Sequence, residues 1–447
     1  MPWKYRFAFV LLLILGTSPI VSAVEVAKSE DPTDPDNVYA NVDEEYVELI
    51  QLFADTLDQV DRNYVKDVDR RALMEAAIRG VISKLDPYSN YIAPEDLERF
   101  KTGVESEFGG IGIQVSTRDG QLVVTSPLFG TPAYEAGIIA GDRITHIEGE
   151  ATKGLSIDDA IKKLKGPVGT EVSMTVYHPS TFTSEKVTVR REMVQIETVL
   201  GDERLEGGNW DFMFDHADKI GYVRVSAFSR HTADDLHQAI TRLLDDGMKG
   251  LILDLRSNPG GLLTSAVEIC DMFIDDGKIV STEGRNSPKR VWTAEKDGTL
   301  PDFPMVILID HYSASASEIL SACLQDHDRA TIVGERSWGK GSVQNIIELE
   351  EGKSALKLTT AGYQRPSGEK IHRFEGDTES DKWGVSPDDG MDIKMSREQK
   401  VAYHTYRRMR DQDTIIPHPP APHPELSEID PVLSKGLEQL KAEISSS

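Results

Sequence analysis

Short apolar runs alternate with amphipathic stretches through the second half of the chain. The apolar runs are Ile220–Val225, Leu251–Leu255, Val306–Ile309 and Thr331–Val333, and helical periodicity marks 232–246, 262–275 and 315–326 between them. Apolar runs of this length are typical of strands that are buried on both faces of a sheet. Alternation of such strands with helices predicts an α/β core over residues 192–395, with reactive groups in the loops at strand ends.

Residues 108–191, which precede this core, have a different pattern. They begin with the glycine-rich segment Phe108 to Val115, which runs into a strand, and they contain one amphipathic helical stretch, Ser156 to Lys165. Further strands are expected at Leu122–Val124, Ile144–Ile147, Val172–Tyr177 and Lys186–Arg190, with a short helix at Pro132–Gly137. The pattern predicts a small, strand-rich module.

The two ends of the chain complete a mixed α/β (α+β), multi-domain fold class. Residues 24–107 are expected to form a leader and then helices, because apolar residues recur at helical spacing from Asp43 to about Gly80. Residues 396–447 indicate a linker followed by one amphipathic helix, Asp430 to Glu443.

Residues 1–23 have the pattern of a secretory signal peptide. Lys4 and Arg6 precede an apolar run from Phe7 to Leu15, and Val21-Ser22-Ala23 provides small residues for cleavage. The chain is therefore expected to be exported to the periplasm or cell envelope. An uncleaved segment would instead attach it to the membrane.

Composition narrows the classes of function. The chain has 447 residues and a net charge of −26, which argues against nucleic acid as a partner because phosphate binding needs clustered Lys and Arg. It has two cysteines, Cys270 and Cys323, which we expect to be buried and free rather than disulfide-bonded. His231 and His237 are six apart, a poor spacing for a helical metal pair, and we expect no metal and no cofactor.

Three loops that each follow an apolar strand could carry chemistry. The segment Asp310 to Glu318 places serines at a strand-to-helix junction, where a nucleophile can project, but Ser315 with Glu318 also fits a helix capping box. Gly334 to Gln344 holds Lys340 between glycines, which fits an inward lysine or a surface loop. Asp254 to Leu263 contains Gly260-Gly261, which could expose backbone N–H groups or form an ordinary turn.

Taken together, these loops resemble those of the carboxyl-terminal processing, or tail-specific, proteases. Six family-like segments occur in order, and they are Leu85–Ser89, the module at 108–191, Asn258–Gly261, Ser313–Glu318, Gly339–Gln344 and Leu356–Ala361. The resemblance implies that the module is a PDZ domain and that residues 192–395 are a serine protease core. It also implies an endopeptidase that cuts proteins near their C-termini.

The resemblance implies a Ser–Lys dyad with Ser315 as nucleophile and Lys340 as general base, and Gln344 as the residue that orients the lysine. It places the oxyanion donors at the backbone of Ala316 and of either Gly260 or Gly261. To act as base, the lysine needs a pKa that is lowered from near 10.4 to roughly 7–8. This shift corresponds to about 4 kcal/mol, which a dry site can provide by disfavouring the charged amine. A histidine base, His311, is the alternative within the same loop.

The same resemblance predicts tail recognition by Gly110, Ile111, Gly112 and Ile113. Loop N–H groups would bind a free C-terminal carboxylate, the following strand would pair with the peptide, and Ile111 and Ile113 would line a pocket for an apolar last side chain. The C-terminal tails of proteins are thus the expected partners. The resemblance also leaves open a lipoprotein adaptor or a homo-oligomer as partners. The rival hypothesis is a catalytically silent PDZ scaffold of the cell envelope, which would be expected to lack Ser315 or Lys340.

Overall fold

The computed structural model describes residues 44–97, 100, 107–205, 208–411 and 426–446. The predicted signal peptide at 1–23, the leader at 24–40 and the linker at 412–425 lie outside these ranges. The chain divides into two units, Met1–Met74 and Glu75–Ser447.

Helix α1 (Glu44–Asn63) is the long helix of the first unit. None of its residues is buried. Its exposed apolar side chains are Tyr46, Val47, Leu49, Ile50, Leu52 and Phe53. The helical periodicity that predicted this helix therefore marks an exposed apolar face.

Helix α2 (Arg70–Ile82) leads into a short strand, β1 (Asn90–Ile92). Ile82 packs with Tyr91 and Ala93 in a small apolar cluster that also contacts Leu356. This cluster attaches the segment after α2 to a strand that lies far along the chain.

The strand-rich module contains a sheet with the strand order β3-β4-β5-β7-β8 and a separate ladder of β2 with β9. Its elements are β2 (Glu107–Gly110), β3 (Ile113–Arg118), β4 (Gln121–Pro127), α4 (Pro132–Glu135), β5 (Arg143–Ile147), β6 (Glu150–Ala151), α5 (Ile157–Leu164), β7 (Glu171–His178), β8 (Thr183–Arg190) and β9 (Glu192–Gln195). These elements confirm the strands and both helices predicted for this region.

A second sheet forms the centre of the core, with the strand order β10-β14-β15-β18-β19. The parallel strands are β14 (Ile220–Val225), β15 (Gly250–Asp254), β18 (Met305–Ile309) and β19 (Thr331–Gly334), and β10 (Val199–Leu200) and β13 (Met213–Asp215) pair antiparallel with β14. The helices α6 (Thr232–Asp245), α7 (Leu263–Phe273) and α8 (Ala316–Asp326) connect the parallel strands. The predicted α/β alternation is confirmed.

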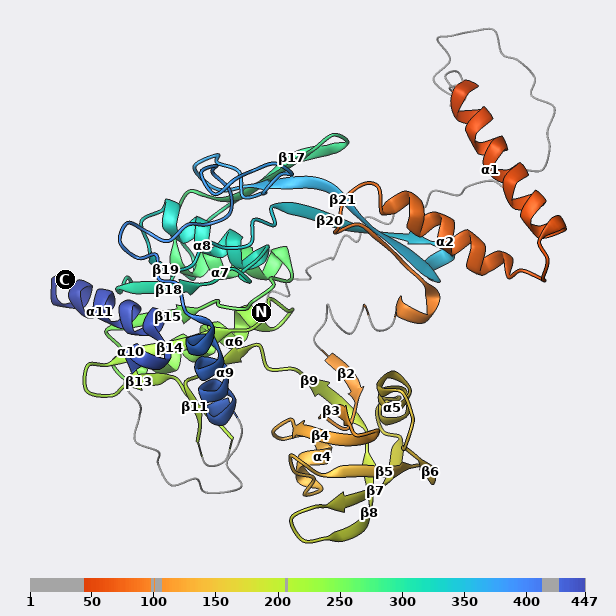
Figure 1. Cartoon of the computed structure of the whole chain (residues 1–447). Coiled ribbons are helices and arrows are strands. Elements are labelled where there is room, and N and C mark those ends of the chain that lie inside the picture. The colour runs from red at the N-terminus through yellow and green to blue at the C-terminus, as the bar shows by residue number, and fades with distance from the viewer. Residues whose placement is uncertain (1–43, 98–99, 101–106, 206–207, 412–425, 447) are drawn as a thin grey trace, which may run out of the picture. The chain divides into compact units, whose positions relative to one another are not determined.

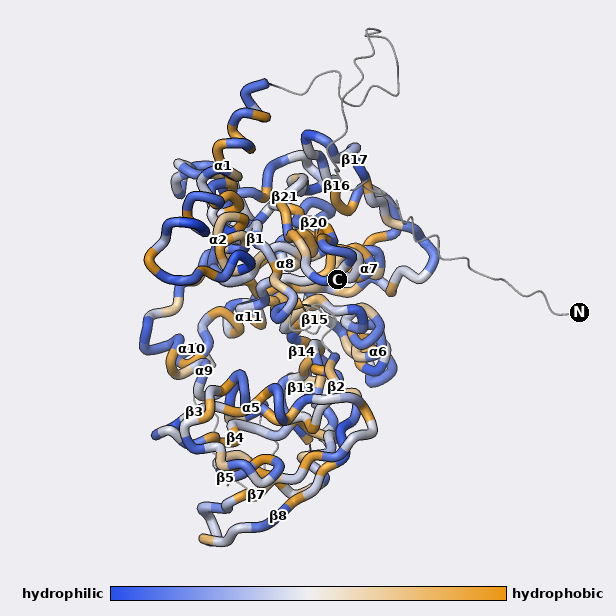
Figure 2. Tube along the Cα trace, turned by 90° about the vertical axis from the view of Figure 1, so that its right-hand side faces the viewer, coloured by the Kyte–Doolittle hydropathy of each residue, from blue (hydrophilic) through white to orange (hydrophobic). Residues whose placement is uncertain are grey.

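Helices cover both faces of this sheet, as Figures 1 and 2 show. One face packs against α6, α7 and α8 through residues such as Leu251, Leu253 and Ile307. The other packs through Ile252 and its neighbours against α11 (Pro431–Ser446). Cys270 and Cys323 are buried and free on α7 and α8, as expected.

The core also contains an antiparallel sheet that the sequence patterns did not predict. Its long hairpin joins β20 (Ser342–Leu349) and β21 (Ser354–Gln364), with the short 3₁₀ turn η1 (Glu350–Gly352) between them (Figure 1). On its other edge β21 pairs with β1 and with β16 (Lys278–Gly284), which pairs with β17 (Ser287–Thr293). The hairpin carries the residues that directly follow Lys340 in the chain.

The remaining elements are β11 (Glu203–Arg204), β12 (Trp210–Asp211), α9 (Arg397–Asp411) and α10 (Leu426–Ile429). Helix α9 lies where a linker was expected, because its many charged residues hide the helical period. Within the described ranges, none of the helices combines the length and apolarity that a membrane crossing requires.

Candidate active site

The three candidate loops meet at one edge of the parallel sheet. Strands β15, β18 and β19 are neighbours, and the loop that follows each strand leaves from its carboxyl end. In sheets of this kind such loops gather at one edge and form the site. Hydrogen bonds join them directly: Ala314 N–H donates to the Asn258 carbonyl at 3.0 Å, and Trp338 N–H donates to the Ser313 carbonyl at 3.0 Å.

Ser315 occupies a strained position at the start of α8. Its φ is +58° and its ψ is −113°, a conformation that a residue with a side chain rarely adopts. The residue is the N-cap of α8, and its backbone N–H donates to the Glu318 carboxylate at 2.8 Å. The capping alternative is therefore correct for the backbone, and the strain indicates an additional role for the serine.

The Glu318 carboxylate connects the serine loop to the lysine loop. Its Oε1 accepts hydrogen bonds from the Ser337 hydroxyl at 2.5 Å and from Gly339 N–H at 2.6 Å. Its Oε2 accepts from Ser315 N–H and from Lys340 N–H, both at 2.8 Å. Glu318 is fully buried, and burial raises the pKa of its carboxyl while the donors oppose that shift by stabilising the ionised form. One carboxylate thus fixes the backbone at both candidate catalytic residues.

The Lys340 amine lies in surroundings that disfavour its charge. Burial lowers its pKa, the positive charge of Lys357 lowers it further, and the charge of Glu318 opposes the shift. Its Nζ lies 5.4 Å from the centroid of the Tyr88 ring. A lysine that loses its proton more easily than in water is what a general base requires.

Ser315, Lys340 and Gln344 are not hydrogen-bonded to one another through their side chains in the described part of the chain. Gln344 donates from Nε2 to the Ser342 hydroxyl at 2.8 Å and to the Thr359 hydroxyl at 3.2 Å. Its carbonyl oxygen is therefore the end that remains for an amine. Catalytic hydrogen bonds often tighten only when substrate binds. The absence of direct bonds between these side chains therefore does not argue against the proposed roles.

The loop Asn258–Gly261 lies directly against the serine. A Cβ placed on Gly260, whose φ is +96°, would lie 2.8 Å from Ser315 Cβ and 2.9 Å from Ala316 N. Gly260 N–H already donates to Asn258 Oδ1 at 2.8 Å. By contrast, the N–H groups of Gly261 and Ala316 have no acceptor among the described residues. Only these two of the expected donors are available to an oxyanion.

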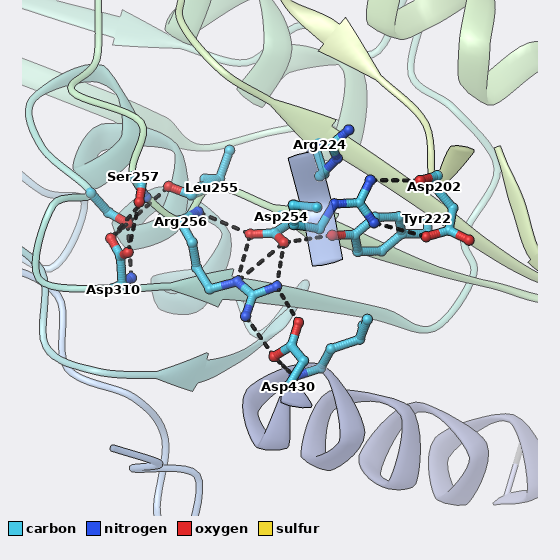
Figure 3. Close-up of polar contacts among 12 residues, drawn as sticks. Asp202, Tyr222, Arg224, Asp254, Leu255, Arg256, Ser257, Asp310 and Asp430 are labelled. Atoms are coloured by element: carbon cyan, nitrogen blue, oxygen red, sulfur yellow. Dashed lines mark hydrogen bonds and ion pairs between the residues drawn. The ribbon is translucent and has the colours of Figure 1, made fainter. Parts of the chain in front are cut away.

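Figure 3 shows a buried ion-pair network around Arg256, which precedes this loop in the chain. Arg256 binds Asp254 at 2.6 Å and Asp430 at 2.7 Å, and all three side chains are almost fully buried. Tyr222 donates to Asp254 at 2.7 Å. Burial alone would raise the pKa of Asp254, but the Arg256 charge and hydrogen bonds outweigh it and lower that pKa. The network joins the start of the glycine loop to the C-terminal helix α11.

The four predicted tail-binding residues lie between β2 and β3 of the strand-rich module. Gly110 ends β2 and Ile113 begins β3. Ile111 is 2% exposed and packs into the module core, while Ile113 is half-buried. The carbonyls of Ile111 and Gly112 accept hydrogen bonds from Ala133 and Leu128, whereas their N–H groups have no acceptor among the described residues.

Strand β3 is an edge strand. Among the described strands it pairs with β4 alone, and α5 packs against it. Gly112 has a φ of +76°, and a Cβ there would lie 2.3 Å from the Thr131 side chain. The loop can therefore present its N–H groups beside an unpaired strand edge, and no residue larger than glycine fits at position 112 without movement.

Sequence reasoning missed several residues around the lysine. Tyr88 lies over the amine, and Thr359 holds Gln344. Both belong to family-like segments for which no role had been derived. His311, the alternative base, stacks on the Trp338 ring at 5.2 Å, and no hydrogen bond joins it to Ser315 within the described ranges.

Comparisons with known proteins match the regions described above. Residues 219–388 match the model of peptidase family S41, residues 123–177 match a PDZ domain, and residues 13–96 match the N-terminal domain of the activating protease CtpB. The carboxy-terminal-processing protease of Bartonella bacilliformis is 36% identical over 384 residues, which are 85% of this chain and 81% of that protein. The chain belongs to the carboxy-terminal-processing proteases.

Further relatives of this carboxy-terminal-processing protease span much of its length. CtpB of Bacillus subtilis is 32% identical, over 81% of this chain and 74% of that protein. The solved photosystem II D1 C-terminal processing protease is 30% identical, over 77% of this chain and 92% of that one, with a TM-score of 0.43. The predicted family, fold class and serine-type peptidase activity are confirmed, with a PDZ domain beside the protease core.

Proposed function

We propose that this protease is an exported endopeptidase that binds free, apolar C-terminal tails and cleaves proteins near those tails with a Ser315–Lys340 dyad. The observation that carries the dyad is the Glu318 carboxylate, which bonds to the backbone N–H groups of both residues. The strained φ of Ser315 and the lowered pKa of Lys340 support the same assignment.

In the first step the Lys340 amine takes the proton of the Ser315 hydroxyl. The serine oxygen attacks the scissile carbonyl carbon, the peptide C–N bond breaks, and the leaving amine takes the proton from the lysine. Water then attacks the acyl-enzyme with the lysine as base again, and the serine is released with its proton. Gln344 is proposed to orient the amine through its carbonyl oxygen, since its nitrogen is already bonded.

We assign the oxyanion donors to the N–H groups of Gly261 and Ala316. Both are free within the described residues, and Gly260, the other candidate, has its N–H bonded to Asn258. Ala316 is also the first residue of α8, where the helix end favours negative charge. Gly260 then contributes by having no side chain, which lets the loop backbone approach the serine.

Tail binding is assigned to the loop Gly110–Ile113 and the free edge of β3. The N–H groups of Ile111 and Gly112 would hold the terminal carboxylate, and the tail would add a strand to β3. Because Ile111 packs into the module core, Ile113 is the isoleucine that remains to contact the last side chain of the tail.

Export rests on the signal pattern of residues 1–23. The proposed domains are a signal peptide (1–23), a leader and helical region (24–107), a PDZ domain (108–191), a protease core (192–395) and a C-terminal linker and helix (396–447). Family resemblance is the support for a lipoprotein adaptor or a homo-oligomer.

The dyad is tested with four variants and one peptide that carries a free, apolar C-terminus. Ser315→Ala and Lys340→Arg should each lower kcat by at least about a thousandfold, because one lacks the nucleophile and the other keeps a protonated guanidinium. Ser380→Ala and Lys353→Ala, both exposed, are the matched controls and should stay near wild-type activity. Retained cleavage by Lys340→Arg would overturn the lysine base.

A further inference from the structure

The turn Asp86–Ser89 lies against the lysine loop. The Tyr88 ring faces the Lys340 amine, with 5.4 Å between Nζ and the ring centroid. The Trp338 indole N–H donates to the Tyr88 hydroxyl at 3.3 Å, so the ring contacts the lysine loop at two places. Strand β1, which follows the turn, pairs with β21 and fixes the segment beside the site.

The turn itself is rigid, because one carboxylate organises its backbone. Asp86 Oδ1 accepts the N–H groups of Tyr88 and Ser89, both at 2.7 Å. Asp86 Oδ2 accepts the Ser89 hydroxyl at 2.8 Å. Side chains of this type stabilise tight turns by bonding to residues two and three positions on. The turn thereby sets the position of the Tyr88 backbone, and the bond from Trp338 holds the ring.

The same turn also reaches Gln344. Thr359 N–H donates to the Ser89 hydroxyl oxygen at 3.0 Å, and the Thr359 hydroxyl accepts from Gln344 Nε2 at 3.2 Å. Holding the nitrogen end of the amide directs its carbonyl end elsewhere. The turn therefore contacts Lys340 through Tyr88, and it reaches Gln344, the proposed partner of Lys340, only through Thr359.

We propose that the turn Asp86–Ser89 positions the general base. Tyr88 excludes water from the Lys340 amine and limits its movement, and Ser89 with Thr359 fixes the orientation of Gln344. The proposal rests on the proposed function, in which Lys340 is the base. Tyr88 and Thr359 act through other residues, so they are positioning residues and not catalytic ones.

The charged groups around the amine define what a Tyr88 variant should do. Glu318 on α8 and Lys357 on β21 face Lys340, and Asp86 and His372 lie near the Tyr88 side of the site. None of these charges is removed by changing Tyr88. The loss of the ring admits water, which favours the protonated amine, and it also removes a weaker ring–cation attraction that acts in the opposite direction. Water access should dominate, because burial is the largest cause of the lysine's shifted pKa.

The test is the pH dependence of kcat/KM for Tyr88→Ala, Tyr88→Phe and wild type. Tyr88→Ala should move the rising alkaline limb up by about one pH unit, so that activity falls about tenfold at neutral pH and returns at high pH. Tyr88→Phe keeps the ring and should rescue the wild-type profile. A second readout is the pH dependence of acetic anhydride labelling of Lys340, measured by peptide mass, which should move by the same amount without any turnover.

The outcomes separate this proposal from the one it rests on. If Lys340→Arg is active, the dyad itself is rejected. If Lys340→Arg is inactive but Tyr88→Ala lowers activity equally at every pH, with unchanged labelling of Lys340, the turn only stabilises the fold and the positioning proposal is rejected.

Thr359→Val and Thr359→Ser test independently whether Thr359 orients Gln344. Valine has the shape of threonine but cannot accept the hydrogen bond from Gln344, whereas serine can. We expect Thr359→Val to lower kcat about tenfold with KM unchanged, and Thr359→Ser to remain within about twofold of wild type. Equal activity of the two variants would remove Gln344 orientation from the proposal.

Discussion

Glu318 shows how one buried side chain can organise a site without touching a substrate. Four donors converge on its two oxygens, and two of those donors are backbone groups of the proposed nucleophile and base. Its pattern of contacts, all donors and no acceptor, matches an ionised carboxylate.

Replacing Glu318 by glutamine is therefore expected to be severe. An amide group keeps the shape but turns one acceptor into a donor, which would face donors already present at Ser337 and Gly339. We expect kcat to fall about a hundredfold or more, with the free energy of unfolding lowered by about 1–3 kcal/mol. Glu379→Gln, on an exposed glutamate, is the control, and peptide cleavage with thermal melting is the measurement. Wild-type kcat in Glu318→Gln would show that the carboxylate charge is dispensable.

The pH dependence of cleavage is the second expectation at this scale. A lowered pKa means that Lys340 becomes neutral, and able to accept a proton, at a lower pH than an ordinary lysine. Activity should be low while the amine is protonated and should rise through mildly alkaline pH as the proton leaves. Initial rates of one peptide across pH, at constant ionic strength, measure the midpoint. A profile that falls with rising pH would contradict a neutral lysine base.

At the scale of elements, β3 and the loop before it determine how a substrate's C-terminal tail could bind. Among the described residues, one edge of β3 has no partner strand and the N–H groups of Ile111 and Gly112 have no acceptor, an arrangement suited to a peptide that ends there. Gly112→Glu is a poor test of this, because any Cβ at position 112 meets the Thr131 side chain and would disturb the loop itself.

The sharper test changes the substrate instead. Amidation of the C-terminus of one peptide removes the charge and leaves every side chain in place. Each charge-assisted bond to a loop N–H is worth roughly 1.5–3 kcal/mol, so affinity for the isolated tail site should fall at least about tenfold. Fluorescence anisotropy of the acid and amide peptides on Ser315→Ala protein measures binding without cleavage. Equal affinities would remove carboxylate recognition and leave the dyad untouched.

Elements also show what the sequence could and could not predict. Strands β14, β15, β18 and β19 were predicted because a strand buried on both faces is apolar throughout. The hairpin β20–β21 was missed, because most of its residues are exposed or half-buried and its pattern alternates weakly. Helix α9 was missed because seven of its fifteen residues are charged.

The candidate site also contains some residues that the sequence could predict and some contacts that it could not. Ser315 and Lys340 were predicted from the family resemblance, which rests on motifs that are local in sequence, and their catalytic roles are still predictions. The contact of Tyr88 with Lys340 was not predictable, since it depends on pairing between strands that lie far apart in the chain, as does the Ser89–Thr359 bond across 270 positions. Which glycine has a free N–H also required the position of the Asn258 side chain.

For the whole molecule, the Asp254–Arg256–Asp430 network ties the C-terminal helix to the start of the glycine loop. Buried ion pairs of this kind are not in themselves strong evidence of stability, but Asp430 accepts two charge-assisted hydrogen bonds from Arg256 that a neutral residue would weaken. The loop that would hold the oxyanion therefore depends on a residue near the end of the described chain.

Asp430→Asn should consequently affect both stability and activity. We expect the free energy of unfolding to fall by about 1–3 kcal/mol, because Arg256 would lose its charge-assisted bonds to Asp430 while Asp254 still balances its charge. Glu438→Gln, which breaks an exposed ion pair on the same helix, should change it by less than about 0.5 kcal/mol. Urea unfolding followed by fluorescence, together with kcat, compares the two. Similar midpoints for both variants would show that the network adds little.

The position of Glu318 has one more consequence, which concerns when the enzyme becomes active. The same carboxylate holds the backbone of the serine and of the lysine, and those residues come from loops after two different strands of the sheet. The bond to Ser315 is local to the start of α8, but the bonds to Gly339 and Lys340 need β19 to be paired beside β18. The proposed nucleophile can thus be held at its place before the proposed base is, and we expect proteolytic activity to appear when the pairing of β18 with β19 brings Lys340 onto the same carboxylate.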